Sequence, residues 1–148
     1  MANETIYVWG TEKTLEANGG SCSTGAIAQA NDASYGVVAD GASFPDARFV
    51  FRGQFGSVTS IENKTIALYA RPLNIDSTND APAPTATYLQ KYIGAFVLQA
   101  SSANTDQYLS LIAYDVPAEA DYYIVNNAGQ TLSAGWTLKV TPRSYKPA

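Results

Sequence analysis

Histidine is absent from the 148-residue chain, and its absence excludes more chemistry than any motif suggests. Histidine is the usual general base, a common zinc ligand and the base of Ser-His-Asp and Cys-His arrangements. Most hydrolase mechanisms are thereby excluded, which leaves paired carboxylates, a lysine or a tyrosine. None of these occurs in a recognisable catalytic pattern. We therefore expect no enzyme activity, no catalytic residue and no cofactor.

Cysteine occurs once, at Cys22 in the run "NGGSCSTG". A single cysteine excludes an intrachain disulfide, and the run lacks the companions that a thiolate metal site needs. A chain of this length can bury roughly two-thirds of its unfolded surface, so it should fold without such links. We expect an inert thiol within one domain that spans residues 1–148.

Charge is sparse, at 15% of residues, and the net charge is −4. The nine basic residues are scattered, whereas a protein that binds phosphate backbones normally carries a basic stripe. Nucleic acid and anionic membranes are therefore not expected as partners. No stretch approaches about 18 apolar residues, and the N-terminus lacks the positive region of an export signal. We expect synthesis in a cytoplasm.

Strand-forming residues are abundant, with ten tyrosines, many threonines and valines, and turn residues at short intervals. Apolar and polar positions alternate in residues 4–9, 47–55, 64–73, 107–116 and 135–142. Residues 92–100, "YIGAFVLQA", are apolar on both sides, which predicts a strand in the middle of the domain. Seven or eight strands separated by turns predict an all-β fold, an antiparallel β-sandwich and most simply a jelly roll.

The aromatic residues fall into two groups by this alternation. Phe49, Phe51, Phe96 and Trp136 occupy positions that should face the core. A second group lies on the opposite strand faces, where it can pack under loops or contact another molecule: Trp9, Tyr69, Tyr108, Tyr114 and Tyr123. Tyrosine and tryptophan are enriched in protein interfaces and in sugar-binding surfaces alike.

Both chain ends are short and polar enough to act as arms that reach a neighbouring subunit. The N-terminal arm is expected over Met1 to Glu4 and the C-terminal arm over Arg143 to Ala148. We therefore add Arg143 and Tyr145 to the candidate interaction residues.

The loop "NIDSTNDAPAPTATY", residues 74–88, is a candidate cation site because Asp76, Asn79 and Asp80 lie close together. An EF-hand spacing that starts at Asp76 fails twice, because Ala81 stands where the turn needs glycine and Thr87 where a bidentate glutamate belongs. We predict no metal site and a connection stiffened by proline, although a weaker cation site stays open.

Two stretches, "LYARPLNIDSTNDAPAPTATYLQKYIGAFVL" and "DYYIVNNAGQTLSAGWTLKVTP", resemble small jelly-roll structural proteins of tailed bacteriophages. The resemblance covers roughly residues 64 to 142. It includes an Arg-Pro-Leu, a Thr-Asn-Asp-Ala-Pro and a closing Ala-Gly-Trp-Thr-Leu-Lys strand. It implies a virion component made in the cytoplasm of a bacterial host. Its position on head or tail does not follow, because the matched residues mostly build the fold.

From this resemblance we expect a capsid decoration protein that binds the major capsid protein or other virion proteins as a homo-oligomer, with a trimer preferred. Such a protein binds a lattice through many modest contacts and needs no titrating side chain. The alternative is a carbohydrate- or receptor-binding β-sandwich on the tail or a fibre, which would use the same exposed aromatic residues. A polysaccharide-cleaving enzyme is a third reading and would need two acids across a cleft.

Overall fold

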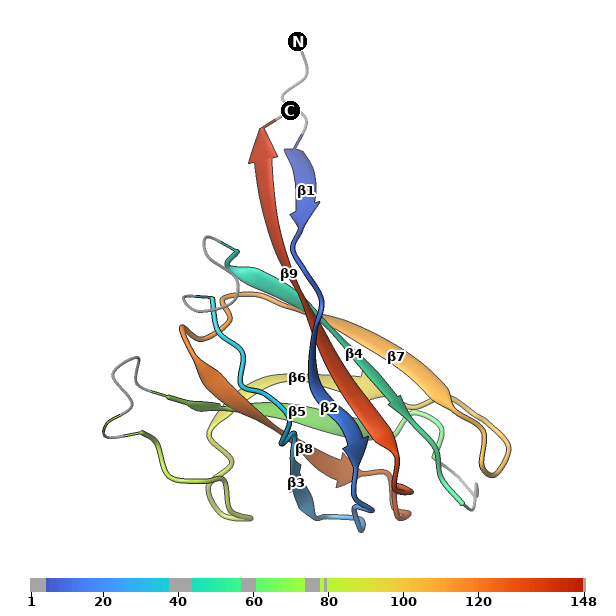
Figure 1. The fold of residues 1–148 in the computed structure, drawn as a ribbon. Coiled ribbons are helices and arrows are strands. Elements are labelled where there is room, and N and C mark those ends of the chain that lie inside the picture. The colour runs from blue at the N-terminus through green and yellow to red at the C-terminus, as the bar shows by residue number, and fades with distance from the viewer. Residues whose placement is uncertain (1–4, 38–43, 57–60, 74–77, 79, 148) are drawn as a thin grey trace.

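The computed structural model describes residues 5–37, 44–56, 61–73, 78 and 80–147, which contain nine strands in two antiparallel sheets (Figure 1). In the first sheet β1 (Thr5–Trp9) and β2 (Lys13–Gly19) both pair with β9 (Trp136–Pro147), followed by β4 (Asp46–Gly53) and β7 (Gln107–Ala113). The second sheet has the order β3 (Ile27–Gln29), β8 (Ala120–Asn127), β5 (Thr65–Pro72) and β6 (Lys91–Val97). The predicted all-β sandwich is confirmed.

The strands pair in a nested pattern along the chain. β5 pairs with β6, β4 with β7, β3 with β8 and β2 with β9, all antiparallel. This pattern is that of one long antiparallel hairpin folded over on itself. The β4–β9 and β5–β8 pairings then join the folded hairpin into two sheets. Nested pairing of eight strands in two sheets is the jelly-roll topology that the sequence favoured.

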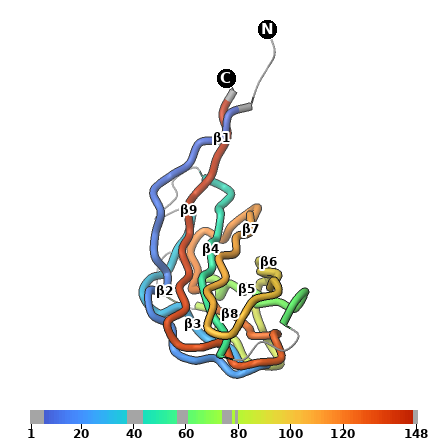
Figure 2. The backbone as a smooth tube through the Cα atoms, turned by 90° about the vertical axis from the view of Figure 1, so that its right-hand side faces the viewer, coloured from blue at the N-terminus to red at the C-terminus, as the bar shows by residue number. Residues whose placement is uncertain are grey.

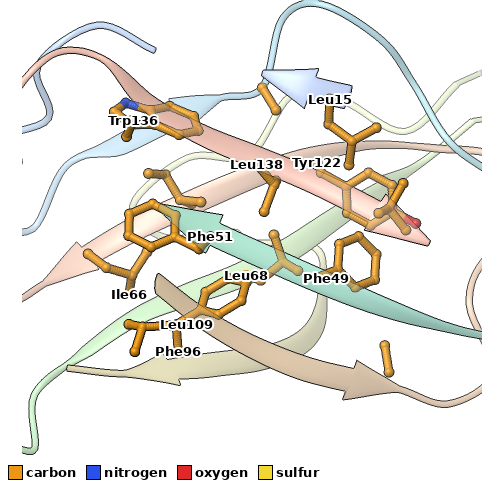
Figure 3. Packing of buried hydrophobic residues seen from close by; sticks show 14 of the residues in the cluster. Leu15, Phe49, Phe51, Ile66, Leu68, Phe96, Leu109, Tyr122, Trp136 and Leu138 are labelled. Carbon is orange, nitrogen blue, oxygen red and sulfur yellow. The ribbon is translucent and has the colours of Figure 1, made fainter. Parts of the chain in front are cut away.

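The core lies between the sheets and follows the predicted alternation (Figure 3). Phe51 from β4 packs against Phe96 and Trp136, with ring centroids 5.4 Å and 6.3 Å apart. Phe49 packs on Tyr122 at 5.0 Å. The buried indole of Trp136 donates a hydrogen bond to the Gly20 carbonyl oxygen at 2.8 Å, so its polar atom is satisfied.

The prediction that residues 92–100 run through the middle of the domain is wrong. Most of this segment forms β6, which is the edge strand of the second sheet, and Tyr92 and Val97 are both exposed. An apolar run alone does not distinguish a central strand from an edge strand, because the outer face of an edge strand can also be apolar. Pro72, in contrast, is the last residue of β5 to pair with β8, as expected.

A two-stranded extension projects beyond the sandwich. β1 pairs with the last part of β9 without a register shift, from Thr5↔Pro147 to Trp9↔Arg143, and Figures 1 and 2 show these segments reaching past the other strands. We call Thr5–Trp9 together with Arg143–Pro147 the ribbon. The segment expected as a C-terminal arm is thus paired strand up to Pro147, and Met1 to Glu4 lie outside the described residues.

Two further predictions concern the candidate cation loop and membrane-spanning segments. Asp76 and Asn79 of the candidate cation loop lie outside the described residues, so the structure does not test that site. Within the described ranges, no helix has the length and apolar character needed to cross a membrane.

Candidate functional site

Exposed aromatic residues gather where the ribbon joins the first sheet. Trp9 lies opposite Arg143, and Tyr7 lies opposite Tyr145, so all four side chains share one face of the ribbon. Tyr114, which directly follows β7, contacts Arg143 from the other side. We call Tyr7, Trp9, Tyr114, Arg143 and Tyr145 the aromatic cluster.

The guanidinium of Arg143 is the centre of this cluster. Its Cζ lies 4.6 Å from the ring centroid of Tyr7, 5.4 Å from that of Tyr114 and 5.8 Å from that of Trp9. Such distances allow cation–π attraction. Its Nη2 lies 3.5 Å from Asp46 Oδ2, and only 9% of the side chain is exposed. From a largely buried position, Arg143 therefore contacts three rings from two segments, β1 and the residue that follows β7.

Arg143 stays charged in this environment. A hydrogen bond with the side chain of Tyr114 raises the pKa of its guanidinium, and this effect outweighs burial, which acts in the opposite direction. Tyr7 and Asp46 raise it further by electrostatic attraction. Arg48 adds a second cation, with its Cζ 5.2 Å from the Trp9 ring centroid.

The rings of the cluster are only partly covered. The exposed fractions are 57% for Tyr7, 45% for Trp9, 70% for Tyr114 and 57% for Tyr145. Tryptophan, tyrosine and arginine are the residues that most often dominate binding energy at protein interfaces. The cluster therefore has the composition of a binding surface.

The structure brings together four of the seven candidate residues and separates the other three. Trp9, Tyr114, Arg143 and Tyr145 belong to the cluster. Tyr108 is 71% exposed and lies near Asp106 at the other end of β7. Because a strand rises about 3.3 Å per residue, Tyr108 lies roughly 20 Å from Tyr114.

Tyr69 and Tyr123 lie on the second sheet instead. They are opposite each other on its outer face, and Tyr69 also packs edge-on against Tyr92 at 5.3 Å. Tyr123 faces away from the core as predicted, but it is only 6% exposed, and burial raises the pKa of its hydroxyl despite the nearby Arg71. Contrary to expectation, Tyr123 offers almost no surface to a partner.

Tyr7 was not among the interaction residues predicted from the sequence. The signal was present, because Tyr7 alternates with Ile6 and Val8 and therefore shares a face with Trp9. What the sequence does not show is that β1 extends beyond the sandwich, where this face meets no covering loop among the described residues.

A shallow depression of about 350 Å³ lies between the end of β6 and the start of β7. Among the described residues that line it, Asp106 is the only acid and lies 3.4 Å from the Nε of Arg52, so these residues do not supply the two opposed acids that glycoside hydrolysis uses. In the part of the chain that the structure describes, no three His, Cys, Asp or Glu side chains come close enough to hold a metal ion.

Comparisons of the chain with protein-family models, with curated proteins and with solved structures gave no match, so the function has to be inferred from the surface and the fold described above.

Proposed function

We propose that this chain is a structural protein of a tailed-bacteriophage virion, a capsid decoration protein that binds the head lattice as a homo-oligomer. The aromatic cluster carries the proposal, because it is a large exposed surface whose composition is that of protein-interface hot spots. The sequence resemblance over roughly residues 64 to 142 supports a role as a virion component. The jelly-roll topology is also one that capsid proteins use.

The cluster suits binding to a repeated surface for two physical reasons. Cation–π contacts with Arg143 hold the rings of Tyr7, Trp9 and Tyr114, so little side-chain entropy is lost when a partner covers them. A homo-oligomer also presents several copies at once, and linked sites bind a lattice far more tightly than one site does. Modest contacts at each cluster are therefore sufficient.

Binding to heads tests the proposal. Purified wild-type chain is mixed with heads that lack it, and co-sedimentation measures the bound fraction. We expect saturable binding, and we expect Trp9→Ala to weaken it about tenfold or more, as a hot-spot residue does. The matched control is Tyr92→Ala, because Tyr92 is similarly exposed at 56% but lies on β6 of the other sheet. A wild-type chain that ignores heads, or equal losses in both variants, contradicts the proposal.

A second candidate is supported by tyrosines in and beside the second sheet. Tyr92 of β6 and Tyr88, which precedes β6, are each 56% exposed, and Tyr92 packs against the ring of Tyr69. Exposed aromatic rings of this kind are platforms for sugars, which favours a carbohydrate- or receptor-binding module on a tail or fibre. Glycan-array binding that Tyr92→Ala abolishes and Trp9→Ala preserves supports this candidate over decoration.

A further inference from the structure

β1 lacks the features that usually protect a sheet edge. Edge strands avoid pairing with other chains through charged residues, prolines, bulges or short length. The sequence of β1, "TIYVW", has no charge and no proline, and its five-residue ladder with β9 contains no register shift. Its other edge has no strand partner among the described residues. β1 is therefore a regular and unprotected template for another strand.

The edge strands of the sandwich itself, β2, β3, β6 and β7, are protected in the described part of the chain. β2 has two register shifts, and the carboxylate of Asp32 accepts a hydrogen bond from the Ala17 amide at its edge. β3 has only three residues. β6 begins with Lys91 and contains a register shift against β5. β7 lies next to β6 where the two sheets meet. Unlike these edge strands, β1 has no feature that protects its edge.

The ribbon has a second open edge on β9. Pairing of β9 with β4 ends at Asp46↔Arg143, whereas pairing with β1 continues to Pro147. Residues 144–147 therefore have a strand neighbour on one side only within the described chain. An isolated two-stranded ribbon is marginally stable in water at best. A further strand on either edge would stabilise the ribbon, and β1 is the less protected of the two edges because residues 144–147 include Lys146 and Pro147.

We propose that the ribbons of three copies of this chain pair head to tail around an axis, with β1 of one copy antiparallel to residues 144–147 of the next. The number of copies rests on the proposed function, in which a trimer is preferred, whereas the pairing rests on the ribbon itself. A closed ring of this kind leaves no strand edge exposed on the ribbon.

Charge favours this arrangement over pairing of two β9 edges. The basic residues of the ribbon are Arg143, which lies beside Asp46, and Lys146, which lies on the open part of β9. Pairing two β9 edges would oppose like charges, whereas pairing β9 with the uncharged β1 does not.

Contact area argues against a simple two-fold dimer. Pairing β1 with β1 of another copy would align five residues from each chain and would leave the edge at residues 144–147 open. The head-to-tail ring uses both open edges of every chain, so it aligns more residues of each chain than two-fold pairing does.

Edge-charged variants test the pairing. A lysine on β1 should block it, so we expect light scattering to give the mass of three chains for the wild type and of one chain for Val8→Lys. Val8 lies opposite the neutral Ser144, so the lysine meets no like charge within its own strand pair. The control is Val97→Lys on the exposed edge strand β6, which should keep the wild-type mass. A monomeric wild type, or a folded Val8→Lys variant with wild-type mass, overturns the proposal.

Disulfide trapping tests the geometry without requiring Val8→Lys to fold. Ile6→Cys chains are mixed with Ser144→Cys or Lys146→Cys chains, which cover two registers on the same strand face, and oxidised. We expect a disulfide-linked pair in one of these mixtures and in no single preparation. Cys22 should not interfere, because it is buried and burial raises the pKa of its thiol. Linkage in Ile6→Cys alone shows two-fold pairing and overturns the proposal, as does the lack of any linkage.

These results are distinguishable from failure of the proposed function. A trapped head-to-tail ring that does not bind heads or capsid protein refutes decoration and keeps the ribbon pairing. Chains that bind heads but give neither the three-chain mass nor the mixed disulfide refute the pairing and keep decoration.

Discussion

Arg143 connects the ribbon to the sandwich, because its guanidinium contacts rings from both and lies beside Asp46. Removing the cation with Arg143→Ala leaves the buried Asp46 carboxylate without its partner, and breaking a buried ion pair costs about 3–5 kcal/mol. We expect the free energy of unfolding, measured by guanidinium denaturation, to fall by about 3 kcal/mol. Lys146→Ala, at an exposed ribbon position, should change it by less than about 0.5 kcal/mol. Equal effects in the two variants contradict this role for Arg143.

Asn126 supports the turn between β8 and β9 from a fully buried position. Its Nδ2 donates to the carbonyl oxygens of Cys22 and Gln130 at 2.8 Å and 2.7 Å, and its Oδ1 accepts from the Ala128 amide at 2.9 Å. Each buried polar group left unsatisfied costs about 1–3 kcal/mol, so Asn126→Ala should lower the unfolding free energy by about 3 kcal/mol. The neighbouring exposed Asn127→Ala serves as the control and should have little effect in the same urea titration.

The buried thiol of Cys22 gives a dependence on pH. Burial raises its pKa in the folded state, whereas the unfolded thiol ionises near pH 8.5. Above that value the unfolded state loses its proton first, so the stability is complete below about pH 8.5 and falls as pH rises towards the folded pKa. We expect the urea midpoint of the wild type to fall between pH 8 and about 10, and the fall to be smaller in Cys22→Ala. A parallel pH dependence in both proteins contradicts this contribution.

Among the strand elements, the end of β2 fits against β9 only because residue 19 is glycine. A Cβ atom on Gly19 would lie 2.0 Å from Cε2 of Trp136, whereas one on Gly20 would meet nothing within 4 Å. Overpacking of a core typically costs 1–3 kcal/mol, so we expect Gly19→Ala to lower the melting temperature by several degrees. Gly20→Ala should leave it nearly unchanged in the same calorimetric scan. If both variants melt together, Trp136 has room to move and the packing argument is wrong.

The sequence predicted those elements whose two faces differ clearly in polarity. In β4 and β7 the inward positions Phe49 and Leu109 alternate with more exposed neighbours, and the structure buries them. β6 was placed wrongly because its apolar run does not report how many strands flank it. The extension of β9 to Pro147 depends on pairing with β1, which is distant in sequence.

The candidate site was predictable in composition but not in position. Alternation identified Trp9 and Tyr114 as residues that face away from the core, and Arg143 and Tyr145 were assigned to a terminal segment. Their convergence depends on the pairing of β9 with both β1 and β4. Local sequence patterns do not encode that pairing, so the same reasoning also selected Tyr123, which the structure buries.

Viewed as a whole, the molecule combines a sandwich whose core is closed by aromatic packing with a projecting ribbon that carries exposed rings and open strand edges (Figures 1 and 3). The described surface gathers exposed aromatic side chains at the ribbon. A sandwich that carries the core and a ribbon that contacts neighbouring subunits would suit the proposed decoration of a lattice.

The proposed decoration role is tested most directly by the copy number of the chain in purified virions. Quantitative mass spectrometry measures the ratio of this chain to the major capsid protein. Decoration of the head lattice predicts a ratio of the same order as one. A handful of copies per particle, or none, contradicts the account.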